Sequence, residues 1–214
     1  MNEAIDELVR IAGDALRPSA SGSGALPAQA SDGILAGLVR LLDRKNGFYA
    51  FEGALHVFAF SAERDGPEVD GRRWNEPGLW INDYRGMADG CLFFAEDVFG
   101  GQFAARDGEV VRFDPETGEV EPLAKDVDAW AAIVLDDRDY QTGWSLAWEW
   151  RIAHGPLSRS SRLLPCMPFV LGGGYEVGNL HASEAVAGMK ARANIAVQIR
   201  DLPDGTPIEL EIVD

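Results

Sequence analysis

Apolar residues near the start of the chain recur every three or four positions, which is the spacing of one helix face. A first helix is therefore predicted within residues 1–17, with an apolar face of Ile5, Leu8, Val9, Ala12 and Leu16. The stretch "PSASGSGALPAQAS", residues 18–31, predicts a flexible linker because Pro, Gly and Ser do not sustain a helix. A second helix is predicted from Ser31 or Asp32, as N-cap, to a stop at Asn46-Gly47.

Beyond the second helix the apolar spacing changes to every second residue, which predicts strands. The alternating runs are separated by Gly and Asp-Gly turns and read "ALHVFAF", "CLFFA", "QFAAR", "EVVRFD" and "EVEPLA". Together they predict an antiparallel meander. Within it, "FDPETGEV" predicts a chain reversal whose carboxylates lie in solvent.

Helical spacing returns after Asp126, which is predicted to cap a helix through "VDAWAAIVLDD". Another helix is predicted in "RDYQTGWSLAWEWRIAHG", ending at Gly155, with Trp144 and Trp148 on its apolar face. The last segment, "ANIAVQIRDLPDGTPIELEIV", alternates over residues 195–199 and again after the "LPDG" turn. It predicts a closing hairpin.

Composition and charge narrow the classes of partner. The chain has 214 residues, 46% of them hydrophobic, and carries 19 Lys and Arg against 35 Asp and Glu, a net charge of −16. That charge repels the phosphates of nucleic acids and anionic lipid surfaces, whereas it attracts a basic macromolecule. No apolar run approaches the roughly 20 residues of a membrane-spanning helix. The acidic start lacks the features of a secretory signal, so a cytoplasmic protein is expected.

The acidic pair Glu96-Asp97 is the first candidate for chemistry. Adjacent side chains of a strand point to opposite faces, so the two carboxylates would not share one proton. A structural interpretation places the pair at a strand end, bound to backbone donors or to Arg106 and Arg112. A functional interpretation makes it part of a partner-binding rim of the sheet.

Motifs for metal, cofactor or nucleophilic chemistry are absent from the sequence. His56, His154 and His181 have no partner at metal-ligand spacing. The glycine-rich "VLGGGYEVGN" lacks the Lys-Ser/Thr of a phosphate loop, and no Gly-x-Ser-x-Gly elbow occurs. Cys91 and Cys166 lie beside apolar residues, which indicates reduced thiols in the core. We therefore expect no catalytic residue, metal or cofactor.

The segment "GRRWNEPGLWINDYRG" places two tryptophans in a polar loop. One interpretation is that the loop folds back and buries both rings on the sheet. The other is that an aromatic and acidic surface suited to a basic partner forms from Trp74, Trp80, Asp83 and Tyr84.

An ordered series of segments resembles the Smi/Knr branch of the SUKH superfamily. The segments are "NGFYAFEGALHVF", "FFAEDVFGGQF", "FDPETGEVE", "DAWAAIV", "RLLPCMPFVLGGGYEVGNL" and "DLPDGTPIEL". The resemblance implies a single α+β domain over residues 32–214, with a curved, mostly antiparallel sheet and helices against one face. This expectation agrees with the periodicity, and it leaves the helix of residues 1–17 and the linker outside the domain.

The resemblance also implies a role, because many bacterial members are immunity proteins that neutralise a cognate toxin domain, often a nuclease, in the cytoplasm. We expect a non-catalytic protein that binds a basic toxin domain with acidic side chains and aromatic anchors. The alternative is an interaction or small-ligand module unrelated to toxins, and a third is a hydrolase that uses Glu96 or Asp97. The apolar face of the first helix could also dock on a second copy of the chain.

Overall fold

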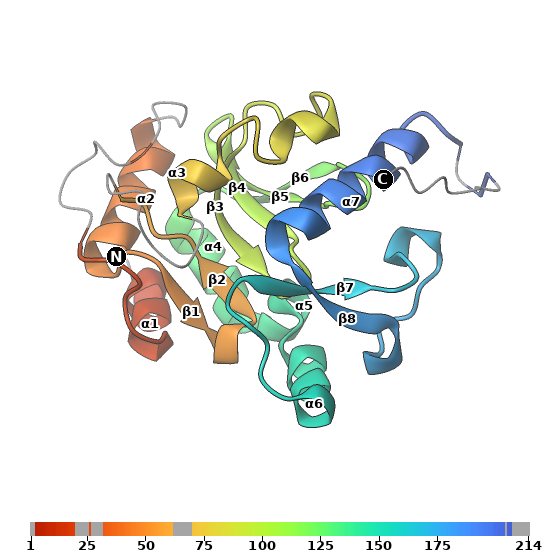
Figure 1. Ribbon diagram of the computed structural model, residues 1–214. Coiled ribbons are helices and arrows are strands. Elements are labelled where there is room, and N and C mark those ends of the chain that lie inside the picture. Colours follow the sequence, from red (N-terminus) through yellow and green to blue (C-terminus); the bar gives the residue numbers. More distant parts are fainter. Residues whose placement is uncertain (1–2, 20–25, 27–31, 62–69, 204, 207–214) are drawn as a thin grey trace.

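A six-stranded antiparallel sheet forms the centre of a single α+β domain (Figure 1). The computed structural model describes residues 3–19, 26, 32–61, 70–203 and 205–206. Strands adjacent in the sheet are also consecutive in the chain, as the alternation predicted. They are β1 (Phe48–Ala50), β2 (Leu55–Val57), β3 (Leu92–Asp97), β4 (Gln102–Arg106), β5 (Glu109–Phe113) and β6 (Val120–Ala124).

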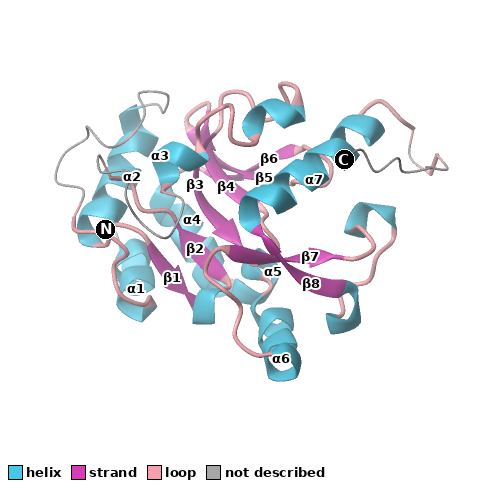
Figure 2. Ribbon diagram, in the orientation of Figure 1, coloured by secondary structure: helices cyan, strands magenta, loops and turns pink. Residues whose placement is uncertain are grey.

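Helices and a separate hairpin surround this sheet (Figure 2). The hairpin pairs β7 (Ser161–Pro165) with β8 (Leu180–Glu184). The helices are α1 (Glu3–Ile11), α2 (Asp32–Arg44), α3 (Gly71–Trp74), α4 (Val127–Asp136), α5 (Arg138–Thr142), α6 (Trp144–His154) and α7 (Ala185–Ile199). The predicted cap of α4 is confirmed, since Asp126 accepts a hydrogen bond from the Ala129 N–H at 2.7 Å.

Both faces of the sheet are covered by helices, rather than the single face that the family resemblance implied. On one face, Trp130 of α4 meets the rings of Phe94 and Phe103 edge-on. On the other, Gln102 Nε2 of β4 lies 3.9 Å from Met189 Sδ of α7, and the Tyr84 hydroxyl donates to the Met189 carbonyl at 3.2 Å. In Figure 1, α4 lies behind the sheet and α7 crosses in front of it. Apolar packing therefore continues on both sides of the strands.

The N-terminal helix belongs to this core. Ile5 and Leu8 of α1 are fully buried and pack in the main hydrophobic cluster. The Ile5 N–H also donates to Asp128 Oδ1 of α4 at 3.3 Å. The expectation that this helix lies outside the domain is wrong, because α4 and its neighbours cover the apolar face within one chain. That face is not available to dock a second copy.

The predicted linker over residues 18–31 falls mostly outside the described residues. Within its described part, the Ser19 hydroxyl donates to the Asp43 carbonyl at 3.1 Å, and Leu26 packs partly buried against the core. The next helix, α2, begins at Asp32 and ends at Arg44, two residues before the predicted Asn46-Gly47 stop.

The C-terminal segment differs most from the sequence-based expectation. Residues 195–199, predicted as a strand, form the last part of α7. Glu184 starts this helix by accepting from the Ala187 N–H at 2.8 Å, and Met189 and Ala193 lie on its buried face. The second predicted strand, residues 207–214, lies outside the described residues. A hairpin does form earlier in the chain, where β7 pairs with β8.

Two surface side chains correct smaller predictions. Trp148 was expected in the core but is exposed on α6, whereas Trp150 of the same helix is buried. Cys91 is buried as expected, but Cys166 is exposed. Neither cysteine is in a disulfide.

Candidate functional site

The predicted aromatic surface does not form, because its rings lie inside the protein. Trp74, Trp80 and Tyr84 are all buried. Trp80 packs against Trp74 and Tyr84, each with a centroid distance of 5.6 Å, and against Phe93 of β3 at 4.9 Å. The loop thus folds back onto the sheet, where burial of the rings stabilises the domain. Of the four residues, Asp83 alone stays exposed.

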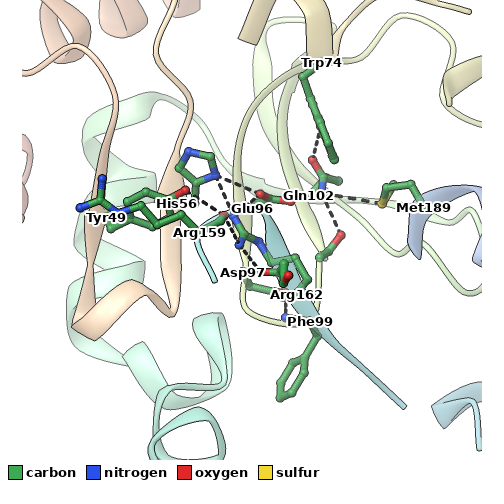
Figure 3. Close-up of polar contacts among 12 residues, drawn as sticks. Tyr49, His56, Trp74, Glu96, Asp97, Phe99, Gln102, Arg159, Arg162 and Met189 are labelled. Carbon is green, nitrogen blue, oxygen red and sulfur yellow. Dashed lines mark hydrogen bonds and ion pairs between the residues drawn. The ribbon is translucent and has the colours of Figure 1, made fainter. Parts of the chain in front are cut away.

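Glu96 is also internal, and it is the centre of a buried polar network. The carboxylate is 1% exposed and forms an ion pair with Arg162 Nη2. His56 Nδ1 lies 3.0 Å from Glu96 Oε1, and Gln102 Nε2 donates to Oε2 at 3.2 Å. Trp74 Nε1 extends the network by donating to Gln102 Oε1 at 2.8 Å. Figure 3 shows these side chains converging from separate strands and from the helix α3.

Asp97 points to the other side of β3, as expected for adjacent strand residues. Its Oδ1 accepts from the backbone N–H groups of Phe99 and Gly101, both at 2.8 Å. Its Oδ2 pairs with Arg112 at 2.8 Å. The predicted partner Arg112 and the backbone donors are confirmed, whereas Arg106 pairs with Asp107. Glu96 and Asp97 are therefore held inside the domain and do not form an exposed rim.

The electrostatics of Glu96 fit a structural role. Burial alone raises the pKa of this carboxyl, but the charge of Arg162 and the hydrogen bonds to the carboxylate outweigh it and lower the pKa to about 2. A group that stays ionised far below neutral pH is poorly matched to proton transfer at neutral pH. Burial raises the pKa of Asp97, although Arg112 and the two N–H donors favour its charged form.

A large acidic cleft is lined in part by Asp97 and Arg112. Its volume is about 860 Å³. The β5–β6 turn, the α5–α6 junction and the segment after β7 supply the other walls. Its charged lining comprises the carboxylates Asp97, Asp114, Glu116, Glu119, Glu121 and Asp139, with the guanidinium groups of Arg112 and Arg192. We call this hollow the acidic cleft, because anionic side chains outnumber cationic ones in its walls.

The β5–β6 turn is shaped by its own side chains. Asp114 Oδ1 accepts from the Glu116 N–H at 2.7 Å, and Gly118 adopts the left-handed φ of +73° that closes the reversal. Sequence reasoning found this turn but placed its carboxylates in solvent. Glu116 is instead buried, because its Oε2 accepts from the Val170 N–H at 2.9 Å.

Aromatic rings form a second part of the lining. Phe169 and Tyr175 stack with centroids 3.9 Å apart and an interplanar angle of 4°. Phe99 meets both rings edge-on. Tyr175 is 70% exposed and Tyr140, also in the lining, is 73% exposed. Large aromatic rings left this accessible beside a cleft are typical of a binding surface.

A second hollow has the opposite charge character. It has a volume of about 480 Å³ and lies between Tyr49 of β1 and the segment after α6. Arg151, Arg159 and Arg162 line it, with Glu52 as its acidic residue. The charged residues that line the two hollows are therefore mainly of opposite sign.

The described ranges contain neither a membrane-spanning helix nor a cluster of metal ligands. Within them, no helix is long and apolar enough to cross a membrane. Nor do the described His, Cys, Asp and Glu side chains gather in a group of three or more that could hold a metal ion.

Comparison with known proteins adds a fold but no family. No family model matches the chain, and no curated protein is significantly similar to it. The crystal structure of Atu4351 from Agrobacterium tumefaciens resembles it with a TM-score of 0.52 and 13% sequence identity. The alignment covers 90% of this chain and 88% of that chain. At this identity the likeness shows a shared α+β fold alone.

Proposed function

We propose that this protein is a non-catalytic binding protein that acts in the cytoplasm as an immunity protein and neutralises a basic toxin domain. The acidic cleft is the observation that carries the proposal, and it replaces the aromatic loop as the partner-binding surface. Resemblance of the sequence to the Smi/Knr branch of the SUKH superfamily supports the toxin as partner.

The charge of the protein favours such a partner in two ways. The net charge of −16 speeds the encounter with a basic protein over the range of electrostatic screening. Close to the surface, exposed carboxylates at the mouth of the cleft, such as Glu119 and Glu121, present acceptors to Lys and Arg side chains. The exposed rings of Tyr140 and Tyr175 supply contact area with few rotatable bonds.

Neutralisation follows from occupancy and not from turnover. A nuclease toxin needs basic side chains to hold the phosphates of its substrate. If those side chains are bound in the acidic cleft, the substrate groove of the toxin is closed. One protein molecule then inactivates one toxin molecule.

A second candidate function has its own support in the volume of the cleft. About 860 Å³ lies within the roughly 300–1,000 Å³ that small-molecule sites occupy. On this alternative the protein is an interaction or small-ligand module unrelated to toxins, and the same lining selects a small cation.

Co-expression with the toxin domain encoded by a neighbouring gene tests the proposal. We expect the two proteins to purify as a one-to-one complex and the host cells to survive toxin expression. The variant Glu119→Lys/Glu121→Lys changes two exposed carboxylates of the cleft. It should weaken the complex and slow association. The control Glu109→Lys/Glu149→Lys makes the same charge change at exposed sites outside the cleft lining, and it should retain most protection.

The salt dependence of the two rate constants distinguishes long-range electrostatic attraction from short-range contacts in the complex. Association should slow markedly as salt rises above physiological concentration, while dissociation changes less, because screening acts on the long-range encounter. Survival without any complex, or equal loss of protection in both double variants, would refute the cleft as the binding surface. Failure of the wild-type protein to protect cells would refute the immunity role.

A further inference from the structure

Two buried oxygen atoms in the wall of the acidic cleft have no hydrogen-bond partner among the described residues. They are Oε1 of Glu116 and Oε1 of Gln141. Glu116 is 4% exposed and Gln141 is 6% exposed, and both residues line the cleft. A buried acceptor that lacks a donor costs free energy until a donor reaches it. Both atoms are hydrogen-bond acceptors, so the group that satisfies them must be a hydrogen-bond donor.

A backbone N–H group holds the Glu116 side chain, and the backbone of Gln141 is held within a helix. The second oxygen of Glu116 is fixed by the Val170 N–H at 2.9 Å, so Oε1 cannot turn away to find another partner without breaking that bond. Gln141 belongs to α5, where its N–H donates to the Asp137 carbonyl at 3.0 Å. The two acceptors therefore come from different elements, the β5–β6 turn and α5, that line the same cleft.

The surrounding charge specifies a cationic donor. Carboxylates outnumber guanidinium groups in the cleft walls, as described above. Burial raises the pKa of the Glu116 carboxyl, and Arg192 opposes that rise. A further cation at Oε1 would also oppose the rise in the pKa of Glu116 and so stabilise the charged carboxylate.

The aromatic rings indicate the shape of the cation. A guanidinium group is planar, stacks on aromatic faces and offers five N–H donors, whereas an ammonium group is a compact point charge. The cleft already holds one guanidinium in this way. Arg112 donates to Asp97 Oδ2 at 2.8 Å and lies over the Tyr140 ring, 5.8 Å from its centroid. The Phe169–Tyr175 stack provides a second aromatic surface in the same lining.

We propose that the acidic cleft binds the guanidinium group of an arginine side chain carried by the basic partner, with Glu116 and Gln141 as its hydrogen-bond acceptors. The proposal rests on the proposed function only for the identity of the protein that carries the arginine. The chemistry of recognition can be tested without that protein.

Peptide titration tests the recognition directly. The full chain is titrated with capped Gly-Arg-Gly, Gly-Lys-Gly and Gly-citrulline-Gly peptides while amide NMR signals are recorded. We expect the arginine peptide to shift signals of residues 114–118, 139–143 and 169–175. Citrulline has the shape of arginine without its charge and should bind at least about tenfold more weakly. The lysine peptide should bind several-fold more weakly than the arginine peptide.

Two variants connect the binding to the named acceptors. Glu116→Gln should weaken the arginine peptide by about tenfold or more, because a charge-assisted acceptor is lost. Glu109→Gln makes the same change at an exposed site outside the cleft and should leave binding unchanged. If Glu116→Gln alters the spectrum of the whole domain, Gln141→Leu removes the other acceptor and should weaken binding by several-fold.

The outcomes distinguish this inference from the proposed function. Equal binding of arginine and citrulline peptides, or arginine binding that survives both Glu116→Gln and Gln141→Leu, would overturn the guanidinium site. If that result accompanies a stable complex with the toxin domain, the inference fails and the immunity role stands. Arginine-specific binding without any toxin complex would support the site and overturn the immunity role.

Discussion

Replacing Glu96 with glutamine removes the charge at the centre of the buried network while keeping its volume. Arg162 is 2% exposed and forms an ion pair with Glu96, so Glu96→Gln leaves a buried guanidinium without its counter-ion. Breaking one side of a buried pair typically costs about 3–5 kcal/mol. The pKa of Glu96 gives a similar figure, since a fall from 4.5 to about 2 corresponds to about 3 kcal/mol. We therefore expect the free energy of unfolding to fall by about 3 kcal/mol.

Urea unfolding followed by tryptophan fluorescence measures this loss. In a domain of this size, 3 kcal/mol also lowers the melting temperature by about 6–12 °C. Glu109→Gln is the matched control, because Glu109 is exposed and should change stability by less than about 0.5 kcal/mol. A loss below about 1 kcal/mol for Glu96→Gln would refute the view that the network stabilises the domain. Weaker toxin binding at unchanged stability would restore Glu96 as a partner contact.

Three further results are expected. Lowering the pH from 4.5 towards 2 should destabilise the wild-type protein more than the Glu96→Gln variant. The folded-state pKa of Glu96, about 2, lies below the ordinary 4.5, so the stabilisation present above pH 4.5 is lost as Glu96 is protonated. Urea titrations at several pH values measure the difference, and the same pH dependence in both proteins would contradict it. Trp74→Phe should lower the free energy of unfolding by about 1–3 kcal/mol in thermal unfolding, because Gln102 Oε1 loses its donor at 2.8 Å. Its affinity for the toxin should stay within about twofold of wild type. A large loss of affinity at unchanged stability would show that Trp74 contacts the partner. Leu8→Ala should lower the free energy of unfolding by about 2–5 kcal/mol, since Leu8 is fully buried within one chain. The mass measured by light scattering should not change. A change in oligomeric mass at unchanged stability would contradict this packing.

The meander could be predicted from sequence because its information is local. Period-two alternation marks β3 to β6, and short turns with left-handed residues join them, as at Asp107 and Gly108 with φ of +50° and +89°. The cap at Asp126 is also a local signal. Such features depend on residues only a few positions apart, so one sequence is enough to find them.

The sequence did not predict the helix α7 because its apolar residues fit both the two-residue spacing of a strand and the three-to-four-residue spacing of a helix. Residues 195–199 alternate as a strand would, yet Met189, Ala193 and Ala196 also recur at helical spacing. The cap at Glu184 and the packing of α7 against the sheet decide between them. The earlier half of the segment, rich in alanine, carried the signal that could have found the helix.

The candidate site could not be predicted because its members are far apart in sequence. Arg162 is 66 residues from Glu96, and His56 is 40 residues from it on the other side. The acidic cleft likewise combines a turn, a helix junction and a loop. From the sequence, Glu116 cannot be told from an ordinary exposed turn carboxylate, because the N–H group that it accepts from belongs to Val170, 54 residues further along the chain.

Hydrogen–deuterium exchange of the purified complex tests most directly whether the acidic cleft binds a basic toxin domain, as we propose. We expect slower exchange on binding in residues 114–121, 139–146 and 169–175, which supply the cleft walls. Segments outside the cleft, such as α2 and the strands β7 and β8 themselves, should exchange as in the free protein. Protection confined to those other segments, with exchange in the cleft unchanged, would show that the toxin binds elsewhere.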